Sequence, residues 1–404
     1  MLTGLCTPPD PLPQPRSGDL SDPYFLGLLP TRGCNMACRY CDFLSGDVQV
    51  MSIDTVRRSV DAYLDLLCQQ RKRTGAVHFF GGEPFHAPQP VQFAVEYTRL
   101  QAATAGISIH FEATTNGNYD PRLARWIADN LDTVVLSLDG PAAAQDLHRP
   151  LRGGRPSFPR VTASADIFSA GDCELVLRTC VSQRNVDALP EIADWFARRF
   201  HPAGVCFEPL SLSESAHRNG LLPPDPLAYA RQFHAAARRL EKDGIPAVLS
   251  TADLSRPRVT PCPVGNDALI VSPEGEINAC YLLEKEWQAH GLDMTLGQVS
   301  PHGFLLDPSA VARVRRFSVY DRPLCTDCFC RFSCAGGCHV HHDTHRPAGQ
   351  YDDQCIRTRL VTAALLLEEL GQGELCALWL ADDHQLAQTA WQVSDRLLDP
   401  ETSQ

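Results

Sequence analysis

The sequence predicts an α/β protein built on a parallel sheet. Between residues 24 and 240, short apolar runs alternate with longer stretches that carry apolar residues at helical spacing. Six such runs, each followed by a helical stretch, are typical of strand–helix units with parallel strands. Polar residues and cysteines follow directly after several of these runs, and ligands bind at the carboxyl ends of the strands in such sheets.

The expected elements follow one another in regular order. The strands are expected at residues 24–29, 76–80, 107–113, 133–139, 174–181 and 204–209. The helices are expected at residues 52–71, 90–105, 120–130, 158–170, 187–200 and 226–243. Ser52 is expected to cap the first helix, and Asp120 with Pro121 forms a good helix start, because proline suits the first helical position.

The composition of the chain changes at four places. Residues 1–23 form a Pro-rich lead-in that lacks the basic and apolar regions of a signal peptide. Residues 24–244 are expected to form the strand–helix domain, and residues 245–258 a linker. Cysteines crowd into residues 259–360, the expected second domain, and a helical tail is expected in residues 361–404.

Composition and charge exclude several classes of function. The 404 residues, 44% of them hydrophobic, are enough for two domains with sizeable cores. A formal net charge of −12 argues against a nucleic-acid partner. No apolar run approaches the roughly 20 residues that span a bilayer, so we expect a cytoplasmic protein without a membrane partner. In a reducing cytosol, 17 cysteines indicate metal or iron–sulfur ligation rather than disulfides.

Three cysteines stand in a short loop directly after the first expected strand: Cys34, Cys38 and Cys41. A structural zinc site usually has four protein ligands, and a [4Fe–4S] cluster is usually held by four thiolates. Three thiolates leave one iron of such a cluster free to bind a small molecule through its nitrogen and oxygen atoms. A three-cysteine zinc or copper site and a set of buried thiols are the alternative interpretations.

The pattern Cys34-x3-Cys38-x2-Cys41 after a first strand resembles the signature of the radical S-adenosylmethionine superfamily. The resemblance implies a partial (β/α)6 barrel similar to a TIM barrel, in agreement with the alternation of strands and helices. It also implies that S-adenosylmethionine binds the free iron of a [4Fe–4S] cluster. Its reductive cleavage gives a 5′-deoxyadenosyl radical, which abstracts a hydrogen atom from the substrate.

Residues at the ends of the next expected strands match further motifs of this superfamily in order. A Gly-Gly-Glu-Pro sequence follows the second strand, where the glycines let carbonyl groups approach an ammonium and the glutamate adds a negative partner. Thr-Asn-Gly ends the third strand and Ser-Leu-Asp-Gly the fourth, and two arginines are candidate partners of a carboxylate. The expected cofactor-binding residues are Gly81, Gly82, Glu83, Pro84, Thr115, Asn116, Ser137, Asp139, Arg149 and Arg178.

The C-terminal cysteines resemble the SPASM domain, an extension of radical enzymes that modify peptides or proteins. Their spacing is Cys-x12-Gly-x4-Cys, then Cys-x2-Cys-x5-Cys-x3-Cys, then one more cysteine. The resemblance implies two auxiliary [4Fe–4S] clusters. The ligands implied for the first are Cys325, Cys328, Cys334 and Cys355, and those for the second are Cys262, Cys280 and Cys338. A zinc ribbon is the alternative, since CxxC pairs often bind zinc.

The second set lacks a matched fourth ligand. Either its iron is open to a substrate thiolate, or Asp267 or Cys330 completes it. The cysteines outside these sets are expected to be small core residues: Cys6, Cys68, Cys173, Cys180, Cys206 and Cys376. The histidines after the last closely spaced cysteine are expected in solvated or capping roles: His339, His341, His342 and His345.

These motifs favour the oxidative modification of a peptide. The leading prediction is a thioether or carbon–carbon crosslink in a ribosomally synthesised peptide. Formylglycine formation on a sulfatase-type protein partner is the alternative. We rank it second because Tyr281 stands where the resemblance places a general-base aspartate, and the nearest acidic residue is Glu284. A non-enzymatic zinc-binding scaffold is a remote third possibility.

The expected partners are a precursor peptide or protein substrate and an electron donor such as flavodoxin or ferredoxin. Only about 23 residues precede the first strand, too few for a winged-helix domain that would bind a leader peptide. Recognition is therefore assigned to a separate leader-binding protein, the barrel mouth or the C-terminal helices. Glu208, Glu214 and Asp225 are expected either in a polar peptide channel or in a solvated loop.

Overall fold

The computed structural model describes residues 25–43, 48–262, 268–342, 347 and 350–386. The Pro-rich lead-in, Cys6, Asp267 and His345 lie outside the described residues. The strands are β1 Phe25–Leu28, β2 Thr74–Phe79, β3 Ser108–Thr115, β4 Thr133–Ser137, β5 Glu174–Val181, β6 Gly204–Pro209, β7 Ala247–Val248, β8 Ala268–Val271, β9 Glu276–Asn278, β10 Thr295–Ser300 and β11 Gly303–Leu306.

The α-helices surround the sheet or follow it in the chain. They are α1 Ile53–Gln69, α2 Pro88–Ala105, α3 Pro121–Asn130, α4 Ala142–His148, α5 Phe158–Ser169, α6 Leu189–Phe200, α7 Glu214–Arg218, α8 Pro226–Glu241, α9 Glu284–Gln288, α10 Pro308–Arg315, α11 Arg331–Cys334, α12 Asp353–Glu369 and α13 Gly373–Ala381. The six predicted helices all form within two residues of the expected bounds. The short helices α4 and α7 were not predicted.

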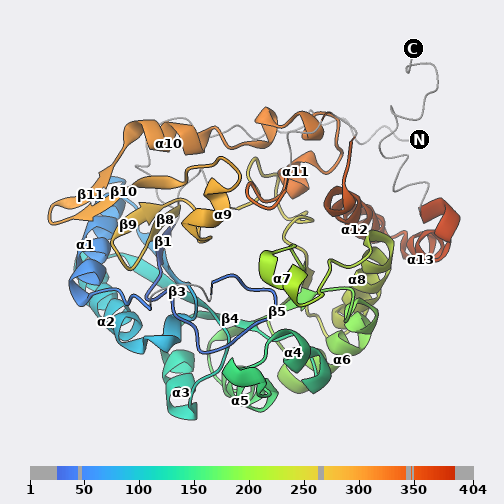
Figure 1. Ribbon diagram of the computed structural model, residues 1–404, viewed down its shortest axis with the longest axis horizontal. Coiled ribbons are helices and arrows are strands. Elements are labelled where there is room, and N and C mark those ends of the chain that lie inside the picture. Colours follow the sequence, from blue (N-terminus) through green and yellow to red (C-terminus); the bar gives the residue numbers. More distant parts are fainter. Residues whose placement is uncertain (1–24, 44–47, 263–267, 343–346, 348–349, 387–404) are drawn as a thin grey trace.

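The first six strands pair in chain order and in parallel, from β1 to β6. Figure 1 shows them curving into an open arc whose outer side carries helices α1 to α3, α5, α6 and α8. The predicted partial (β/α)6 barrel is thereby confirmed. Its helix starts are also confirmed, since Ser52 accepts a hydrogen bond from the Thr55 N–H and Asp120 accepts two at the start of α3.

Alternate residues of each strand face opposite sides of the curved sheet. Leu26 and Leu28 belong to the main hydrophobic core with the helices, whereas Phe25 and Leu29 pack in a separate cluster with Ile270. Period-2 alternation explains this division, because successive side chains of a strand point to opposite faces. The side chains of the second group project inside the arc, where a ligand site is expected.

The cysteine-rich region continues the same sheet. Strand β8 pairs in parallel with β1, and β9, β10 and β11 follow outward from it in antiparallel pairs. In the described residues this gives an 11-stranded sheet that ends at β7, which falls in the predicted linker 245–258. The division into separate domains stays a prediction, but the two regions share one sheet.

The helical tail packs against the barrel through charged residues. His234 Nε2 of α8 lies 2.6 Å from Glu368 Oε1 of α12, and Arg238 Nη1 lies 2.9 Å from Glu368 Oε2. The Cys376 thiol of α13 lies 3.5 Å from His234 Nε2. Because the guanidinium and the imidazole both pair with Glu368, we interpret this group as an ion-pair contact between helices rather than as a metal site.

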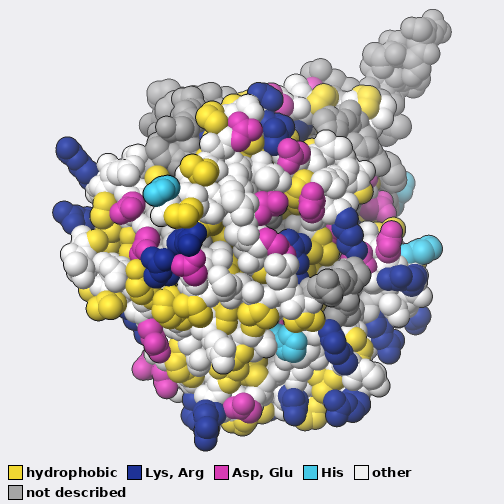
Figure 2. All heavy atoms as spheres, turned by 60° about the vertical axis from the view of Figure 1, so that its left-hand side comes forward, with side chains coloured by type: hydrophobic (Ala, Val, Ile, Leu, Met, Phe, Trp, Pro, Cys, Tyr) yellow, Lys and Arg dark blue, Asp and Glu magenta, His cyan; other side chains and the backbone are white. Residues whose placement is uncertain are grey.

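The described residues include no helix long and apolar enough to cross a membrane. On the face shown in Figure 2, acidic and basic side chains are mixed, and apolar side chains lie among them. This face therefore has no single-sign field of the kind that would bind a polyanion.

Candidate active site

The predicted cluster loop follows β1, and its first cysteine, Cys34, lies six residues after Leu28. The residues Cys34, Cys38 and Cys41 are all partly exposed. Burial raises the pKa of Cys34 to about 11, and Glu83 and Cys41 act in the same direction. Burial also raises the pKa of Cys38, Arg149 opposes it, and the charges of Cys41 and Cys34 add to it. The three thiols thus lie close enough to influence one another, as a shared metal cluster requires.

The loop is held from one side by the segment after α4. The N–H of Ala37 donates to the Pro150 carbonyl at 2.9 Å, and the N–H of Arg39 donates to the His148 carbonyl at 2.8 Å. Met36 adds an antiparallel bridge to Leu151. The fourth strand–helix unit therefore fixes the loop backbone on both sides of the second cysteine, Cys38.

Helix α7 covers the loop from the other side. Ser213 Oγ, which caps α7, donates to the Tyr40 carbonyl at 2.7 Å. The Ser215 N–H donates to Asp42 at 3.0 Å, and Asn219 Nδ2 donates to the Arg39 carbonyl at 2.9 Å. These bonds join segments more than 170 residues apart, which explains why the sequence did not predict them.

The Gly-Gly-Glu-Pro segment packs backbone to backbone against the cluster loop. A Cβ at Gly82 would lie 2.3 Å from the Gly33 carbonyl oxygen, and a Cβ at Gly81 would lie 2.6 Å from that of Thr31. The φ angle of Gly81 is +139°, which L residues rarely adopt. The Glu83 N–H also donates to the Gly33 carbonyl at 2.9 Å. Both glycines are therefore required by the approach of the two backbones.

We predict that Gly82→Ala displaces the cluster loop. The new Cβ would meet backbone oxygens of Gly33 and Arg32, which cannot move as a flexible side chain would. Overpacking of this kind costs about 1–3 kcal/mol, so both the thermal midpoint and the affinity for S-adenosylmethionine should fall. Gly204→Ala is the control, because its Cβ would meet only ordinary contacts at 3.6 Å. Equal behaviour of the two variants would contradict the prediction.

Glu83 joins the end of β2 to the end of β3. Its carboxylate accepts hydrogen bonds from Thr115 Oγ1 at 2.7 Å, from the Asn116 N–H at 2.7 Å and from the Phe85 N–H at 3.1 Å. Pro84 starts the short 3-10 helix Pro84–His86 that Glu83 caps. Burial raises the pKa of Glu83 to about 7, although the three hydrogen bonds act against it. Its predicted contact with an ammonium group stays a prediction.

We predict that Glu83→Gln destabilises the fold, most strongly in acid. Glutamine replaces one carboxyl oxygen by an NH2 group. Even in the protonated acid the hydroxyl oxygen can accept a hydrogen bond, but the NH2 group cannot, so one buried donor loses its partner at a cost of about 1–3 kcal/mol. The folded pKa of about 7 exceeds the ordinary 4.5, so the contribution of Glu83 to stability is complete below pH 4.5 and is lost as the pH rises through 7. The difference in thermal midpoint between the natural chain and Glu83→Gln should therefore shrink from about pH 5.5 to about pH 8. A constant difference would contradict the shifted pKa.

Asn116 connects the end of β3 directly to the cluster loop. Its Nδ2 lies 3.5 Å from Cys34 Sγ and donates to Asn35 Oδ1 at 2.9 Å. Asn116 thus lies beside the first cysteine, and Thr115 reaches the loop only through Glu83. The predicted cofactor contacts of both residues stay predictions.

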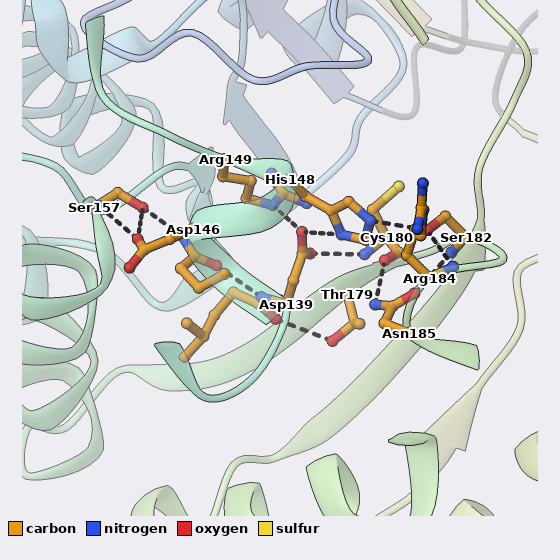
Figure 3. Close-up of polar contacts among 12 residues, drawn as sticks. Asp139, Asp146, His148, Arg149, Ser157, Thr179, Cys180, Ser182, Arg184 and Asn185 are labelled. Atoms are coloured by element: carbon orange, nitrogen blue, oxygen red, sulfur yellow. Dashed lines mark hydrogen bonds and ion pairs between the residues drawn. The ribbon is translucent and has the colours of Figure 1, made fainter. Parts of the chain in front are cut away.

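A buried network behind the loop orients Arg149 (Figure 3). The Asp139 carboxylate lies 3.0 Å from Arg149 Nε and 3.2 Å from His148 Nδ1. It also accepts the Cys180 N–H at 2.8 Å, and His148 Nε2 lies 2.8 Å from Ser182 Oγ. Asp139, His148 and Ser182 are all fully buried, so this network cannot meet a substrate and acts by holding Arg149.

The charge of Asp139 is maintained inside the protein. Burial alone would raise its pKa, but Arg149 and then His148 outweigh burial and hold the pKa below its ordinary value. The Arg149 guanidinium lies 5.3 Å from the centre of the Tyr40 ring and lowers the pKa of Cys38. Arg149 is therefore a buried cation at the cluster loop. The predicted direct contact of Asp139 with a cofactor stays a prediction.

A cavity of about 590 Å³ opens at the carboxyl ends of the strands, beside Cys41. Among the predicted residues, Ser137, Arg149 and Arg178 line it. Glu208 and Glu214 line it as well, whereas Asp225 caps α8 through the N–H groups of Leu227 and Ala228. The predicted polar channel thus includes the two glutamates but not the aspartate.

Residues from the cysteine-rich region close one side of this cavity. Glu286 and His290, in and after α9, and His341 contribute to its lining. Glu286 and His290 were not predicted, and His341 was expected in a solvated or capping role instead. The reason is that no local pattern marks a residue that reaches the cavity from another part of the fold. Tyr281 is likewise inside the arc, where its ring lies 4.6 Å from Phe80 and 6.2 Å from Phe25.

The predicted cysteine sets also converge. Burial raises the pKa of Cys334 to about 12, and the charges of Cys328 and Cys325 add to it. Burial also raises the pKa of the Cys355 thiol, and the charges of Asp352, Cys334 and Cys328 add to this rise. In the second set, burial raises the pKa of Cys280 to about 12, and Cys262 and Cys338 add to it.

Some predictions about single residues were wrong. Cys330 lies against Cys328 and Cys334, on the first set rather than on the incomplete second one. His342 is buried, with Nε2 at 3.3 Å from Cys355 Sγ, so it is not solvated. Among the expected core cysteines, Cys173, Cys180 and Cys376 are buried, Cys206 is half-buried and Cys68 is exposed.

The fold and site define a radical SAM enzyme. Residues 28–196 match the family model described as the radical SAM superfamily. The chain therefore carries a radical SAM domain, whose cofactors are S-adenosylmethionine and an iron–sulfur cluster.

Within this class, the chain is related to anaerobic sulfatase-maturating enzymes. It is 23% identical over 338 residues to the cysteine-type enzyme of Clostridium perfringens. The aligned region covers 77% of this chain and 87% of the relative. It is 26% identical over 330 residues to the serine-type enzyme of Klebsiella aerogenes, over 76% and 77% of the two chains.

Solved structures also share the fold, among them those of anSMEcpe and Streptococcus suis SuiB. The structure of anSMEcpe with bound AdoMet has a TM-score of 0.67 at 17% identity, over 87% of this chain and 99% of that chain. Streptococcus suis SuiB bound to its precursor peptide SuiA has a TM-score of 0.56 at 16% identity, over 82% and 75% of the chains.

Proposed function

We propose that the chain is a maturase that oxidatively modifies a peptide or protein substrate by S-adenosylmethionine-dependent radical chemistry. The observation that carries the proposal is the three-thiol loop of Cys34, Cys38 and Cys41, which adjoins a cavity of about 590 Å³. The cavity lies at the carboxyl ends of the strands and is closed on one side by the cysteine-rich region. This arrangement fits a cofactor next to the loop and a substrate side chain beyond it.

The residues present fit the cofactors that the superfamily uses. When bound, the cluster and S-adenosylmethionine supply a 5′-deoxyadenosyl radical for hydrogen abstraction. Gly81 and Gly82 let the Gly-Gly-Glu-Pro segment reach the backbone of the cluster loop. Arg149 offers a positive charge for a carboxylate group, and an ammonium group bound beside Glu83 would favour the carboxylate form of that residue. The Asp139 network holds Arg149 in one orientation, so less entropy is lost when an anion binds.

The substrate class has two candidates. A ribosomally synthesised peptide that receives a thioether or carbon–carbon crosslink is supported by the shared fold with SuiB bound to its precursor peptide. A sulfatase-type partner that receives formylglycine is supported equally by the relation to sulfatase-maturating enzymes. Both candidate reactions include the two auxiliary clusters, which the two cysteine sets would hold.

Tyr281, which stands where the resemblance places a general-base aspartate, does not distinguish a sulfatase-type substrate from a ribosomally synthesised peptide. Its hydroxyl is buried and, among the described residues, has no hydrogen-bond partner. Its ring packs between aromatic neighbours, which supports a packing role. Glu284, the acidic residue that follows, is exposed and accepts a hydrogen bond from Gln288 at 2.6 Å. Of the acidic residues near this segment, Glu286 lines the cavity.

The proposal includes an electron donor such as flavodoxin or ferredoxin. A second opening of about 390 Å³ adjoins Cys38 and Cys41 between the loop and α7. Its lining is mixed in charge, with the basic residues Arg39, Arg218 and Lys285 and the acidic residues Asp42 and Glu214. A donor protein bound over this opening would lie close to the loop cysteines. A separate leader-binding protein stays a prediction.

The test begins with anaerobic reconstitution, counting of iron and sulfide, and an assay of deoxyadenosine release with dithionite. About twelve irons with release supports three clusters. A sulfatase peptide and a precursor peptide encoded near this chain are then offered as substrates. An aldehyde that reacts with a hydrazide probe identifies formylglycine, whereas the loss of two hydrogens without an aldehyde identifies a crosslink. Bound zinc without deoxyadenosine release would overturn the proposal.

A further inference from the structure

Arg322 is a buried cation in the middle of the cysteine-rich region. Its exposed fraction is 5%, and it precedes the short 3-10 helix Pro323–Cys325. The ion pairs among the described residues include none between Arg322 and a carboxylate. Burying a guanidinium without a carboxylate is costly, so a compensating negative group is expected nearby.

The guanidinium is held by the turn that joins the two cysteine sets. It donates to the carbonyl oxygen of Gly337 at 3.0 Å and to that of Gly336. Both glycines have positive φ angles, 86° and 69°, and they lie between Cys334 of the first set and Cys338 of the second. The turn therefore brings Arg322 to the place where the chain passes from one set to the other.

Arg322 adjoins cysteines of both sets. The N–H of Cys325, in the first set, donates to the Arg322 carbonyl at 3.0 Å. The two glycines that accept from its guanidinium are followed directly by Cys338 of the second set.

The remaining polar neighbour of Arg322 does not neutralise it. His339 contacts the guanidinium through a ring nitrogen. A neutral imidazole can accept a hydrogen bond but carries no negative charge. The compensating charge is therefore left to the metal clusters that the thiols would hold.

A second arginine contacts the first set. Arg359 Nη1 donates to Cys328 Sγ at 3.0 Å, and its guanidinium lies 4.0 Å from the centre of the Tyr351 ring and 4.9 Å from that of Phe329. Cys328 belongs to the first set. Arg359 thus provides an internal comparison for the shared position of Arg322.

We propose that Arg322 is an electrostatic bridge that raises the reduction potentials of both auxiliary clusters, whereas Arg359 raises that of the first alone. The inference rests on the proposed function, since it needs both clusters. A four-thiolate cluster is anionic and gains a further negative charge on reduction. A fixed cation in a low-dielectric interior favours that reduced form, and the effect falls with distance.

The test is a redox titration of the reconstituted holoenzyme, followed by electron paramagnetic resonance. Arg322→Gln should lower the midpoint potentials of both auxiliary clusters and leave that of the barrel cluster unchanged. Arg322→Lys keeps the charge and should restore most of both shifts. Arg359→Gln should lower only one auxiliary potential, which assigns the signals to the two sets.

The outcomes separate this inference from the proposed function. Iron is counted beside every titration, so absent clusters in the natural chain would refute the proposed function itself. Full iron loading with a shift at one cluster or at neither would overturn the bridging role of Arg322. Arg322→Met is a second uncharged variant in case Arg322→Gln assembles poorly. Loss of both clusters from the two uncharged variants but not from Arg322→Lys would support the inference, and loss of only one would contradict it.

Discussion

Cys38→Ala is expected to abolish the reductive cleavage of S-adenosylmethionine and to remove about four irons per chain. The reason is that three protein thiolates are the minimum that holds the barrel cluster while leaving one iron for the cofactor. Cys38 lies beside Arg149 and within the influence of Cys34 and Cys41, so its loss leaves two thiolates and a buried cation. Deoxyadenosine release with dithionite and iron content are the measurements.

Cys68→Ala is the matched control for this variant. Cys68 is an exposed cysteine on α1, remote in role from the predicted cysteine sets. It should keep the iron content and the cleavage rate of the natural chain. Wild-type cleavage by a purified, folded Cys38→Ala chain would refute the assignment of the loop as a cluster site.

The fold was predictable where local patterns were strong. The expected strands 174–181 and 204–209 match β5 and β6 residue for residue, because buried parallel strands appear as short apolar runs between helices. The extension of the sheet by strands β8 to β11 was not predicted, because the local patterns of these strands are weak. Strands β8, β9 and β11 have only three or four residues, and β8 pairs with β1 from more than 200 residues away.

The site was predictable to the level of motif residues but not of their partners. The three loop cysteines, Glu83 and Arg149 could be named from spacing, because their chemistry depends on a short local pattern. The contact between His148 and Ser182 joins residues 34 positions apart, and no sequence pattern connects them. The same holds for His341, whose position at the cavity depends on how the cysteine-rich region packs onto the barrel.

The second large effect concerns the first auxiliary set. Cys328→Ala is expected to retain uncoupled cleavage of S-adenosylmethionine but to yield no modified peptide, with about four irons fewer per chain. Cleavage should survive because the loop cysteines and their supporting bonds lie in the barrel, outside this set. Product and iron should be lost because the iron that Cys328 would hold has no cofactor to replace the missing thiolate. The buried Arg359 also loses the sulfur to which it donates.

Cys330→Ala provides the sharpest control, because Cys330 lies two residues from Cys328 and is buried beside it. It is outside the predicted ligand pattern, so this variant should keep both the iron content and the product. The pair of variants therefore separates loss of a ligand from general damage to the region. Product from Cys328→Ala would make the first auxiliary cluster dispensable. If only Cys330→Ala lost iron, Cys330 would be the cluster ligand and Cys328 would not. The resemblance in spacing alone does not separate these two assignments.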